Sequence, residues 1–183
     1  MADIVSDVLG LPNVMRIAFT YGTIIVGNAG FKAVADALTA GKITIVVNAR
    51  LGGNTAIYSY KHNRFSFGFA DAGGNADKQS LVVHEAVHAG FDVASTPMLV
   101  KESEGLAYIA QCLYYYYANE SAYSGGSKPT FGDPILKAAW PVSQVALTKP
   151  ALDAEDMKPL FKAISVHPLY KKRYEATDKF DGV

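Results

Sequence analysis

The clearest helical pattern in the first third of the chain runs over residues 28–40. Its apolar side chains recur three and four residues apart, as they do on one face of a helix: Phe31, Val34, Ala35 and Leu38. Gly41 follows as a stop, so we predict a helix here. Before it, residues 5–11 fit a short helix, and residues 15–26 fit either a strand or a helix.

Strand patterns follow this helix. Residues 42–48 are a β-branched run, which predicts a buried strand. In residues 55–60 and 64–70, larger side chains alternate with small ones, which predicts a hairpin with one aromatic face. That face carries Phe65, Phe67 and Phe69. Asn63 tolerates positive φ at the tip, and we expect His62 beside it to be an exposed turn residue rather than a ligand.

Two longer helices are predicted in the middle of the chain. The first begins after a cap at Asn75 or Asp77 and ends near Gly90. The second has Thr96 as its cap and covers residues 97–117. Beyond them the Gly-, Ser- and Pro-rich sequence predicts a loop, and three further apolar patterns predict helices. The loop is residues 121–134 and the helices are residues 134–146, 153–165 and 168–177.

These elements predict an α+β fold with a small mixed or antiparallel sheet followed by helices. A chain of 183 residues, 50% hydrophobic and 19% charged, fits one globular domain. We therefore expect a single domain over residues 1–183, with a sheet-containing half at 1–75 and a helical half at 76–183.

Charge and cysteine content exclude several classes of protein. Lys plus Arg and Asp plus Glu number 17 each, so no basic field predicts binding to nucleic acid. Cys112 is the single cysteine, which excludes an internal disulfide framework. No apolar run is long enough for a membrane span, and the apolar stretch after Arg16 lacks the form of a signal peptide. We expect a cytoplasmic protein, with signal-independent export remaining open.

The first predicted central helix carries a metal-binding pattern. His84 and His88 are four residues apart, so at about 3.6 residues per turn both imidazoles lie on one face and can reach one ion. Glu85 flanks them and is placed to deprotonate a water molecule held by that ion. Two neutral nitrogen ligands beside one carboxylate base predict a Zn²⁺ site in a hydrolase.

A zinc site of this kind needs a third protein ligand, and the nearest carboxylates are Asp92, Glu102 and Glu104. Glu104 is followed by Gly105 and Ala107. With the histidine segment, this stretch resembles the H-E-x-x-H and E-G-x-A segments of gluzincin metallopeptidases, in the small form called minigluzincins. The resemblance covers roughly residues 77–112. It implies a zincin-like fold, peptidase activity and Glu104 as the third ligand.

The chain departs from the gluzincin pattern at two points. The gap from His88 to Glu104 is shorter than in large members, and Tyr108 stands where thermolysin-like members have Asp. The orienting partner of the histidines is therefore open, and Asp92 is one candidate. The metzincin pattern is excluded because Phe91 and Ala94 stand where it requires Gly and His.

The resemblance also implies a residue that stabilises the oxyanion, for which the candidates are Tyr108, His167 and Tyr170. It further implies that an edge strand from residues 55–70 holds a peptide substrate by its backbone. The leading hypothesis is therefore a zinc peptidase acting on a peptide or protein substrate. Two alternatives remain: a zincin-fold binding protein without turnover, and a toxin or effector domain with the same chemistry.

Overall fold

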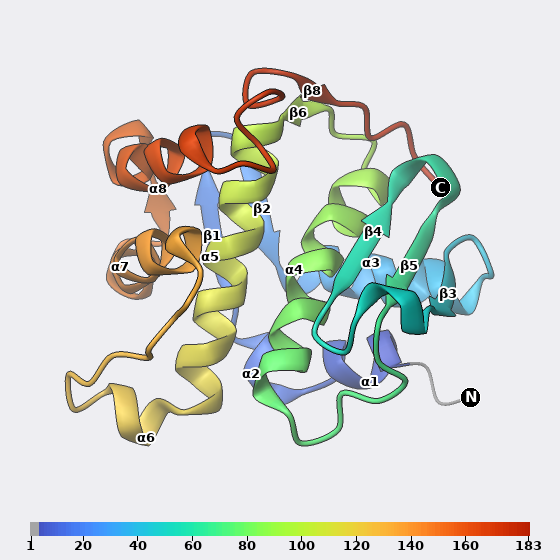
Figure 1. Ribbon diagram of the computed structural model, residues 1–183, viewed down its shortest axis with the longest axis horizontal. Helices are drawn as coiled ribbons and strands as arrows, with labels where there is room; N and C mark the ends of the chain where they lie inside the picture. The colour runs from blue at the N-terminus through green and yellow to red at the C-terminus, as the bar shows by residue number, and fades with distance from the viewer. Residues whose placement is uncertain (1–3) are drawn as a thin grey trace.

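The computed structural model describes residues 4–183, which fold into helices and three small sheets (Figure 1). Two long helices, α4 (Ala76–Val93) and α5 (Val100–Ala118), pack against each other at the centre of this part of the chain. The other helices surround the pair: α1 (Ile4–Leu9), α2 (Pro12–Met15), α3 (Asn28–Thr39), α6 (Glu120–Tyr123), α7 (Pro134–Thr148) and α8 (Ala154–Val166). The described chain has the mixed α+β character that the sequence predicts.

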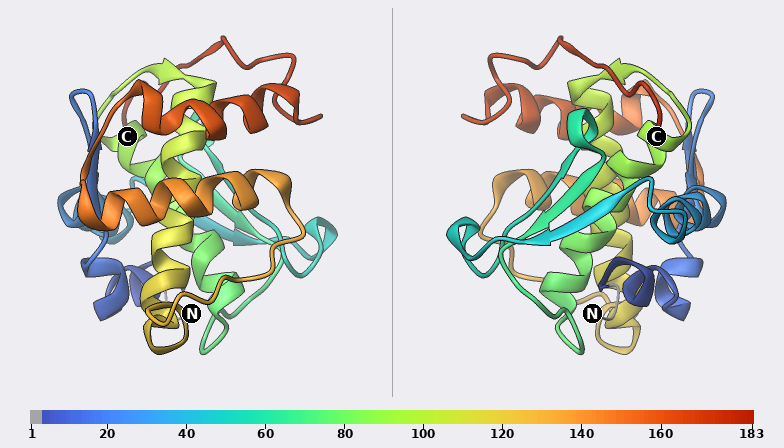
Figure 2. Two further views of the ribbon diagram at one scale, coloured as in Figure 1. Left: turned by 90° about the vertical axis from the view of Figure 1, so that its left-hand side faces the viewer. Right: turned by 90° about the vertical axis from the view of Figure 1, so that its right-hand side faces the viewer.

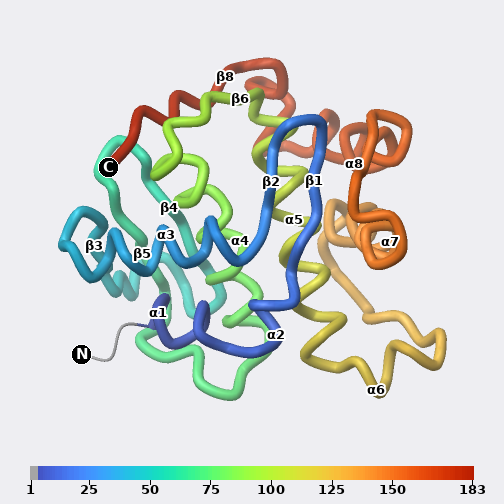
Figure 3. Tube along the Cα trace, turned by 180° about the vertical axis from the view of Figure 1, so that it is seen from behind, coloured from blue at the N-terminus to red at the C-terminus, as the bar shows by residue number. Residues whose placement is uncertain are grey.

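The hydrophobic core surrounds α4 and α5. Helix α3 packs on α4 from the side seen in Figure 3, and α7 and α8 pack on α5. The stretch that the sequence left ambiguous forms an antiparallel hairpin of β1 (Ala18–Tyr21) and β2 (Ile24–Gly27), and β7 (Ala151–Leu152) joins β1 in parallel. No helix within residues 4–183 is long and apolar enough to cross a bilayer.

A second sheet lies beside α4 (Figure 2) and has the strand order β3–β5–β4. The predicted hairpin is confirmed, with β4 (Ala56–Ser59) antiparallel to β5 (Arg64–Phe67) and Asn63 at φ 43° near the tip. The prediction of a buried strand at β3 (Thr44–Val47) is wrong. This strand pairs in parallel with β5 only, at the outer edge of the sheet, and Val46 is 42% exposed.

Helix α4 begins as predicted, because the side chain of Asn75 accepts a hydrogen bond from the Lys78 N–H. It does not end at Gly90 but continues to Val93. A Cβ atom at position 90 would already touch Gly30 of α3. That would be ordinary van der Waals contact, at 3.8 Å, so Gly90 lies where α3 packs on α4 and does not terminate the helix.

Helix α5 begins at Val100, not after a cap at Thr96. The two residues before it form β6 (Met98–Leu99), which pairs antiparallel with β8 (Thr177–Asp178) near the C-terminal end of the chain. This pairing holds the segment extended, which sequence periodicity does not reveal. The Glu102 carboxylate then accepts a hydrogen bond from the Leu99 N–H at the start of the helix.

The predictions for the C-terminal region are confirmed in part. Helices α7 and α8 match the predicted residues 134–146 and 153–165 within two residues at each end. Residues 168–177, predicted to be helical, instead form successive turns that lead the chain back to β8. The predicted loop 121–134 begins with the short helix α6 and is otherwise irregular.

Gly68, at the end of β5, is a position where a side chain does not fit. A Cβ atom there would lie 1.6 Å from the carbonyl oxygen of Gly52. We expect Gly68→Ala to lower the free energy of unfolding by about 1–3 kcal/mol or more, because the Gly52 backbone must move. Gly53→Ala is the control, since a Cβ there meets nothing within 4 Å. Equal denaturation midpoints for both variants would contradict this prediction.

Candidate metal centre

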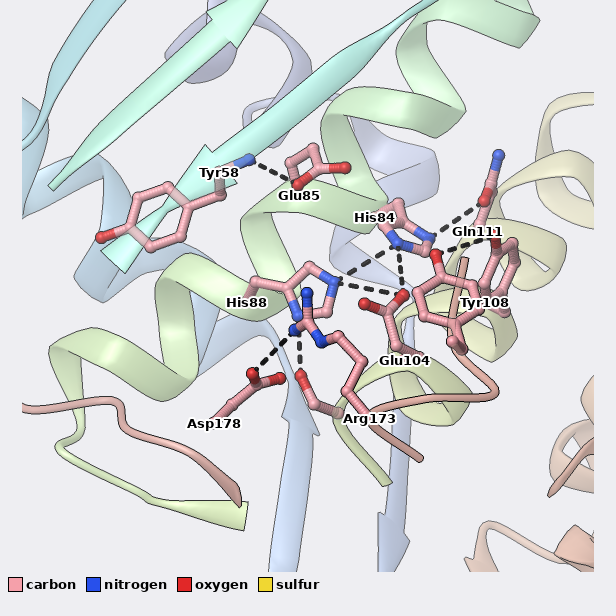
Figure 4. Close-up of polar contacts among 11 residues, drawn as sticks. Tyr58, His84, Glu85, His88, Glu104, Tyr108, Gln111, Arg173 and Asp178 are labelled. Atoms are coloured by element: carbon pink, nitrogen blue, oxygen red, sulfur yellow. Dashed lines mark hydrogen bonds and ion pairs between the residues drawn. The ribbon is translucent and has the colours of Figure 1, made fainter. Parts of the chain in front are cut away.

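Three buried side chains from α4 and α5 converge on one point (Figure 4): His84, His88 and Glu104. Their ligand atoms all lie within 4.8 Å of one another. The two histidine Nε2 atoms are 3.3 Å apart, and Glu104 Oε2 lies 3.6 Å from His84 Nε2 and 3.8 Å from His88 Nε2. This group could hold a metal ion, and it joins the residues that the sequence singled out as ligands.

The local structure explains how these ligands meet. The histidines are one turn apart on the face of α4 that packs on α5, and Glu104 lies in the second turn of α5. Gly105 follows Glu104 because α8 approaches there: a Cβ would lie 3.1 Å from atoms of Met157 and Phe161. Glu102 is placed at the helix start by its bond to Leu99 and takes no part in the group.

One atom of the group is left without a partner. Glu104 Oε2 is buried and makes no hydrogen bond within the described residues. A buried carboxylate oxygen of this kind is unfavourable unless a donor or a cation satisfies it. Both imidazole Nε2 atoms face the same point, so a cation bound there would satisfy all three groups.

Each histidine is oriented by a hydrogen bond from its other ring nitrogen. His84 Nδ1 lies 3.1 Å from Gln111 Oε1, and His88 Nδ1 lies 2.8 Å from Ser103 Oγ. The Gln111 side-chain amide in turn donates to Ser80 Oγ at 3.2 Å, which fixes Oε1 as the acceptor. Nδ1 of His84 is then the protonated nitrogen, and Nε2 carries the lone pair that a metal needs.

The sequence did not identify these orienting partners. Gln111 follows Glu104 by seven residues, which is two helical turns, and a polar residue at that spacing on a largely apolar helix was a usable signal. Asp92, the candidate named for this role, is engaged elsewhere. Its carboxylate accepts from the Tyr58 hydroxyl at 2.6 Å and from the Gly182 N–H at 3.2 Å. Asp92 therefore ties α4 to β4 and to the C-terminal segment.

Glu85 lies between the histidines and β4 (Figure 4). Its Oε2 accepts a hydrogen bond from the Tyr58 N–H at 2.6 Å. Burial raises the pKa of Glu85 to about 7, although His84 and the Tyr58 N–H favour the charged form. A carboxyl group with a pKa near neutrality can both accept and return a proton.

The electrostatics of His88 and Glu104 favour cation binding, whereas the pKa of His84 is raised, because the lowering effect of burial is outweighed by Glu104 and Glu85. Burial lowers the pKa of His88 to about 4, so its ring is neutral near pH 7. Burial would raise the pKa of Glu104, but the adjacent histidines outweigh it and lower that pKa to about 2. Glu104 is therefore an anion beside the neutral His88 ring, which suits it to bind a positive ion.

Two of the three oxyanion candidates lie beside the metal-binding group. The Tyr108 ring packs edge-on against His84 with 4.6 Å between ring centroids, and its hydroxyl lies 3.4 Å from that of Tyr170. Hydrogen bonding by Tyr170 helps to keep the pKa of Glu104 low. His167 lies behind Tyr170, with which it makes a ring contact at 5.5 Å. The structure therefore favours Tyr108 and Tyr170 over His167 for a role in the site.

An ion pair from the C-terminal segment borders the opposite side of the group (Figure 4). Arg173 Nη2 donates to Asp178 Oδ1 at 3.1 Å, and the charge of Arg173 contributes to lowering the pKa of His88. A hydrogen bond from Ser103 favours the charged form of Asp178, whose pKa burial raises. The C-terminal segment thus lies close to Ser103, the partner of His88.

Strand β4 presents its free edge to the same region. Gly68 N–H donates to the Thr55 carbonyl, so alternate residues from Thr55 onward bond to β5. The backbone groups of Ala56 and Tyr58 consequently point away from β5, as the Tyr58 bond to Glu85 shows. Ala56 and Tyr58 are themselves buried, so only part of this edge is open. An edge strand with backbone groups unpaired by its sheet is a place to which an extended chain can add.

We expect Gln111→Ala and Ser103→Ala each to weaken metal binding by about 10- to 100-fold, because each removes the bond that orients one histidine. Titration of the metal-free protein with zinc measures the change. Asp92→Asn is the control and should bind zinc as the wild type does, since Asp92 contacts neither ring. Wild-type affinity in both alanine variants would show that these bonds do not orient the histidines.

Comparisons of the chain with protein-family models, with curated proteins and with solved structures gave no match. The function assigned to this site consequently depends on the geometry and chemistry of its own residues.

Proposed function

We propose that this protein is a zinc-dependent peptidase with a zincin-like arrangement of edge strand, histidine helix and glutamate helix. The observation that carries the proposal is the convergence of His84, His88 and Glu104, with Glu104 Oε2 buried and without a hydrogen-bond partner among the described residues. Two imidazoles and one carboxylate suit zinc better than Mg²⁺ or Ca²⁺, which favour oxygen ligands alone.

The separations between the ligand atoms are compatible with zinc. Ligands bonded at about 2.0–2.1 Å in a tetrahedron are about 3.3–3.4 Å apart. The two Nε2 atoms are separated by 3.3 Å, and the Glu104 oxygen lies 3.6 and 3.8 Å from them. Small movements of the Glu104 side chain would therefore bring its oxygen to the spacing that a shared zinc ion requires.

The residues around the ligands can perform the steps of amide hydrolysis. Zinc bound by the triad supplies Lewis acidity, which polarises the substrate carbonyl and makes water more acidic. Glu85 accepts the proton of the attacking water and returns it to the amine that leaves. We assign to the hydroxyl groups of Tyr108 and Tyr170, which lie 3.4 Å apart, the role of donating hydrogen bonds to the carbonyl oxygen as negative charge develops on it.

Substrate positioning is assigned to β4. The backbone groups of Ala56 and the carbonyl of Tyr58 face away from β5 and can pair with an extended peptide, whereas the Tyr58 N–H is already bonded to Glu85. Such pairing would bring one peptide bond past the triad. Strand addition of this kind requires a segment without secondary structure of its own. The proposed substrates are therefore flexible peptides and unfolded segments of proteins.

The proposal is tested by incubating the zinc-loaded protein with a mixture of proteome-derived peptides and identifying new termini by mass spectrometry. We expect cleavage by the wild type, and a loss of about 10²- to 10⁴-fold in Glu85→Gln, because general base catalysis contributes about that much. Zinc binding without cleavage by the wild type would overturn the peptidase proposal and favour a binding protein that uses the same centre.

A further inference from the structure

A cavity of about 600 Å³ lies beside the metal centre, between the N-terminal half of α4, the middle of α5 and the segment that leads into α7. Two of its lining residues belong also to the surroundings of the triad. Gln111 holds His84, and Leu81 lies one turn before His84 and Glu85 on α4. The cavity therefore adjoins residues that surround the triad, although none of the three ligands lines it.

The cavity is also in line with the free edge of β4. Asn54, which lines it, lies two residues before the start of that strand. A peptide added along β4 and passing the triad would reach the cavity at the N-terminal end of the strand. One of its side chains could then enter the cavity.

The charged residues that line the cavity are all acidic. Asp77, in the first turn of α4, and Asp133, the N-cap of α7, both line it, and no Lys, Arg or His does. Neither carboxylate forms an ion pair within residues 4–183. No cationic side chain of the described residues therefore neutralises the negative charge of this cavity, and only the N-terminal ends of α4 and α7 offset it.

Both carboxylates are held in place through one oxygen. Asp77 Oδ1 accepts the Tyr115 hydroxyl at 2.7 Å, and Asp133 Oδ1 accepts the N–H groups of Ile135 and Leu136 at 2.6 and 3.2 Å. Within the described part of the chain, no hydrogen bond engages Oδ2 of either residue. Each aspartate therefore has an acceptor left for a ligand and is already oriented, which reduces the entropy lost on binding.

Aromatic rings form the rest of the wall. The rings of Tyr115 and Phe131 pack edge to face with 5.4 Å between their centroids, and Tyr123 also lines the cavity. Carboxylates next to aromatic rings suit a ligand whose positive charge sits at the end of an apolar chain. The apolar chain can pack on the rings, and the charged end can contact the carboxylates and the faces of the rings. Lysine and arginine side chains have this form.

A metal ion is a poorer fit to this cavity. Within residues 4–183, the only group of three or more His, Cys, Asp or Glu side chains whose ligand atoms converge is the triad itself. Asp77 and Asp133 alone do not provide the six to eight oxygen ligands that Ca²⁺ takes. An organic cation therefore fits this cavity better than a metal ion does.

We propose that this cavity is a specificity subsite that binds a lysine or arginine side chain of the peptide substrate. The proposal rests on the peptidase function above and adds to it a preference for basic peptides. The geometry assigns Asp77 and Asp133 as the groups that bind the cation, and Tyr115 and Phe131 as the surfaces for its apolar stem.

The test measures binding without turnover, in zinc-loaded Glu85→Gln protein. The probes are fluorescent alanine hexapeptides that carry either arginine or its neutral isostere citrulline at each position in turn. We expect arginine to bind about tenfold more tightly than citrulline at one position, since a hydrogen bond to a charged group contributes at least that factor. Asp77→Asn and Asp133→Asn should each reduce this preference, and the double variant should abolish it.

The variants are chosen to preserve the fold. Asparagine at 133 can still cap α7, and asparagine at 77 can still accept the Tyr115 hydroxyl. Asp36→Asn, on the exposed side of α3, is the matched control and should keep the full arginine preference. Melting temperatures and zinc content should be the same in all of these proteins.

The outcomes separate this inference from the proposed function. Equal affinity for arginine and citrulline at every position, or an arginine preference that survives in the double variant, would overturn the subsite. An arginine preference that depends on both aspartates would support the subsite. That result would stand even if the wild-type protein cleaved none of the peptides, a finding that would overturn only the peptidase assignment.

Discussion

Replacing Glu104 with alanine is expected to remove most of the bound metal, whereas replacing Glu85 with glutamine is expected to leave it in place. Glu104 Oε2 faces the Nε2 atoms of both histidines, so its loss removes a direct bond to the ion. Loss of a hydrogen bond that orients a ligand weakens metal binding by roughly 10- to 100-fold, and the affinity of Glu104→Ala for zinc should fall by more than that. Elemental analysis after purification without chelators measures the zinc content of each variant.

Glu85→Gln should retain about one zinc ion per chain and lose turnover. Its side chain reaches the Tyr58 N–H rather than the triad, and glutamine can accept that same hydrogen bond. Glutamine cannot accept the proton of the attacking water. Retention of metal with loss of turnover is therefore the signature of a base that is not a ligand.

Glu102→Ala is the matched control, because it removes a carboxylate from the same helix two residues away. Glu102 accepts the Leu99 N–H at the start of α5 and takes no part in the triad. The variant should keep its zinc and lose about 1 kcal/mol of stability with the cap. Full zinc affinity in Glu104→Ala together with its loss in Glu102→Ala would disprove the assignment of the third ligand.

Removal of zinc should lower the melting temperature by roughly 8–16 °C. An ion that binds only the folded chain, at a free concentration 1,000 times its Kd, stabilises it by about 4 kcal/mol. Each kcal/mol shifts the midpoint by about 2–4 °C in a chain of this length. Thermal scans at a fixed free zinc concentration of about 1,000 times the Kd, and in excess chelator, measure the shift.

His84→Ala and His88→Ala should melt at the temperature of the zinc-free wild type, because neither can form the complete site. Addition of chelator should no longer change their melting temperatures. His62→Ala is the control: this histidine is exposed near the hairpin tip, as the sequence predicts, and should melt like the wild type in both conditions. A chelator response that persists in His84→Ala would show that the stabilising ion binds elsewhere.

The sequence alone predicted the features that depend on neighbours along the chain. The one-turn spacing of His84 and His88 is a property of any helix that contains both, and the cap at Asn75 acts within three residues. Alternating phenylalanines and Asn63 likewise predicted the hairpin of β4 and β5. The two candidate ligands on α4 and their base could therefore be named without a structure.

Only the tertiary structure decided which distant groups meet. Gln111 orients His84 from 27 residues away, and Asp92, which the sequence proposed as an orienter, bonds instead to Tyr58 and Gly182. The start of α5 and the turns that replace the predicted last helix follow from the pairing of β6 with β8. These contacts join segments far apart in the chain, so local propensity does not encode them.

The same distinction applies to the site as a whole. The sequence supplied His84, Glu85 and His88 from one helix, and a family resemblance supplied Glu104. The packing of α4 on α5 brings Glu104 within 3.8 Å of both histidines, and the approach of α7 places Asp133 in the cavity beside them. Residue types and their spacing along one helix determined the chemistry, whereas the packing of several helices determined which side chains surround it.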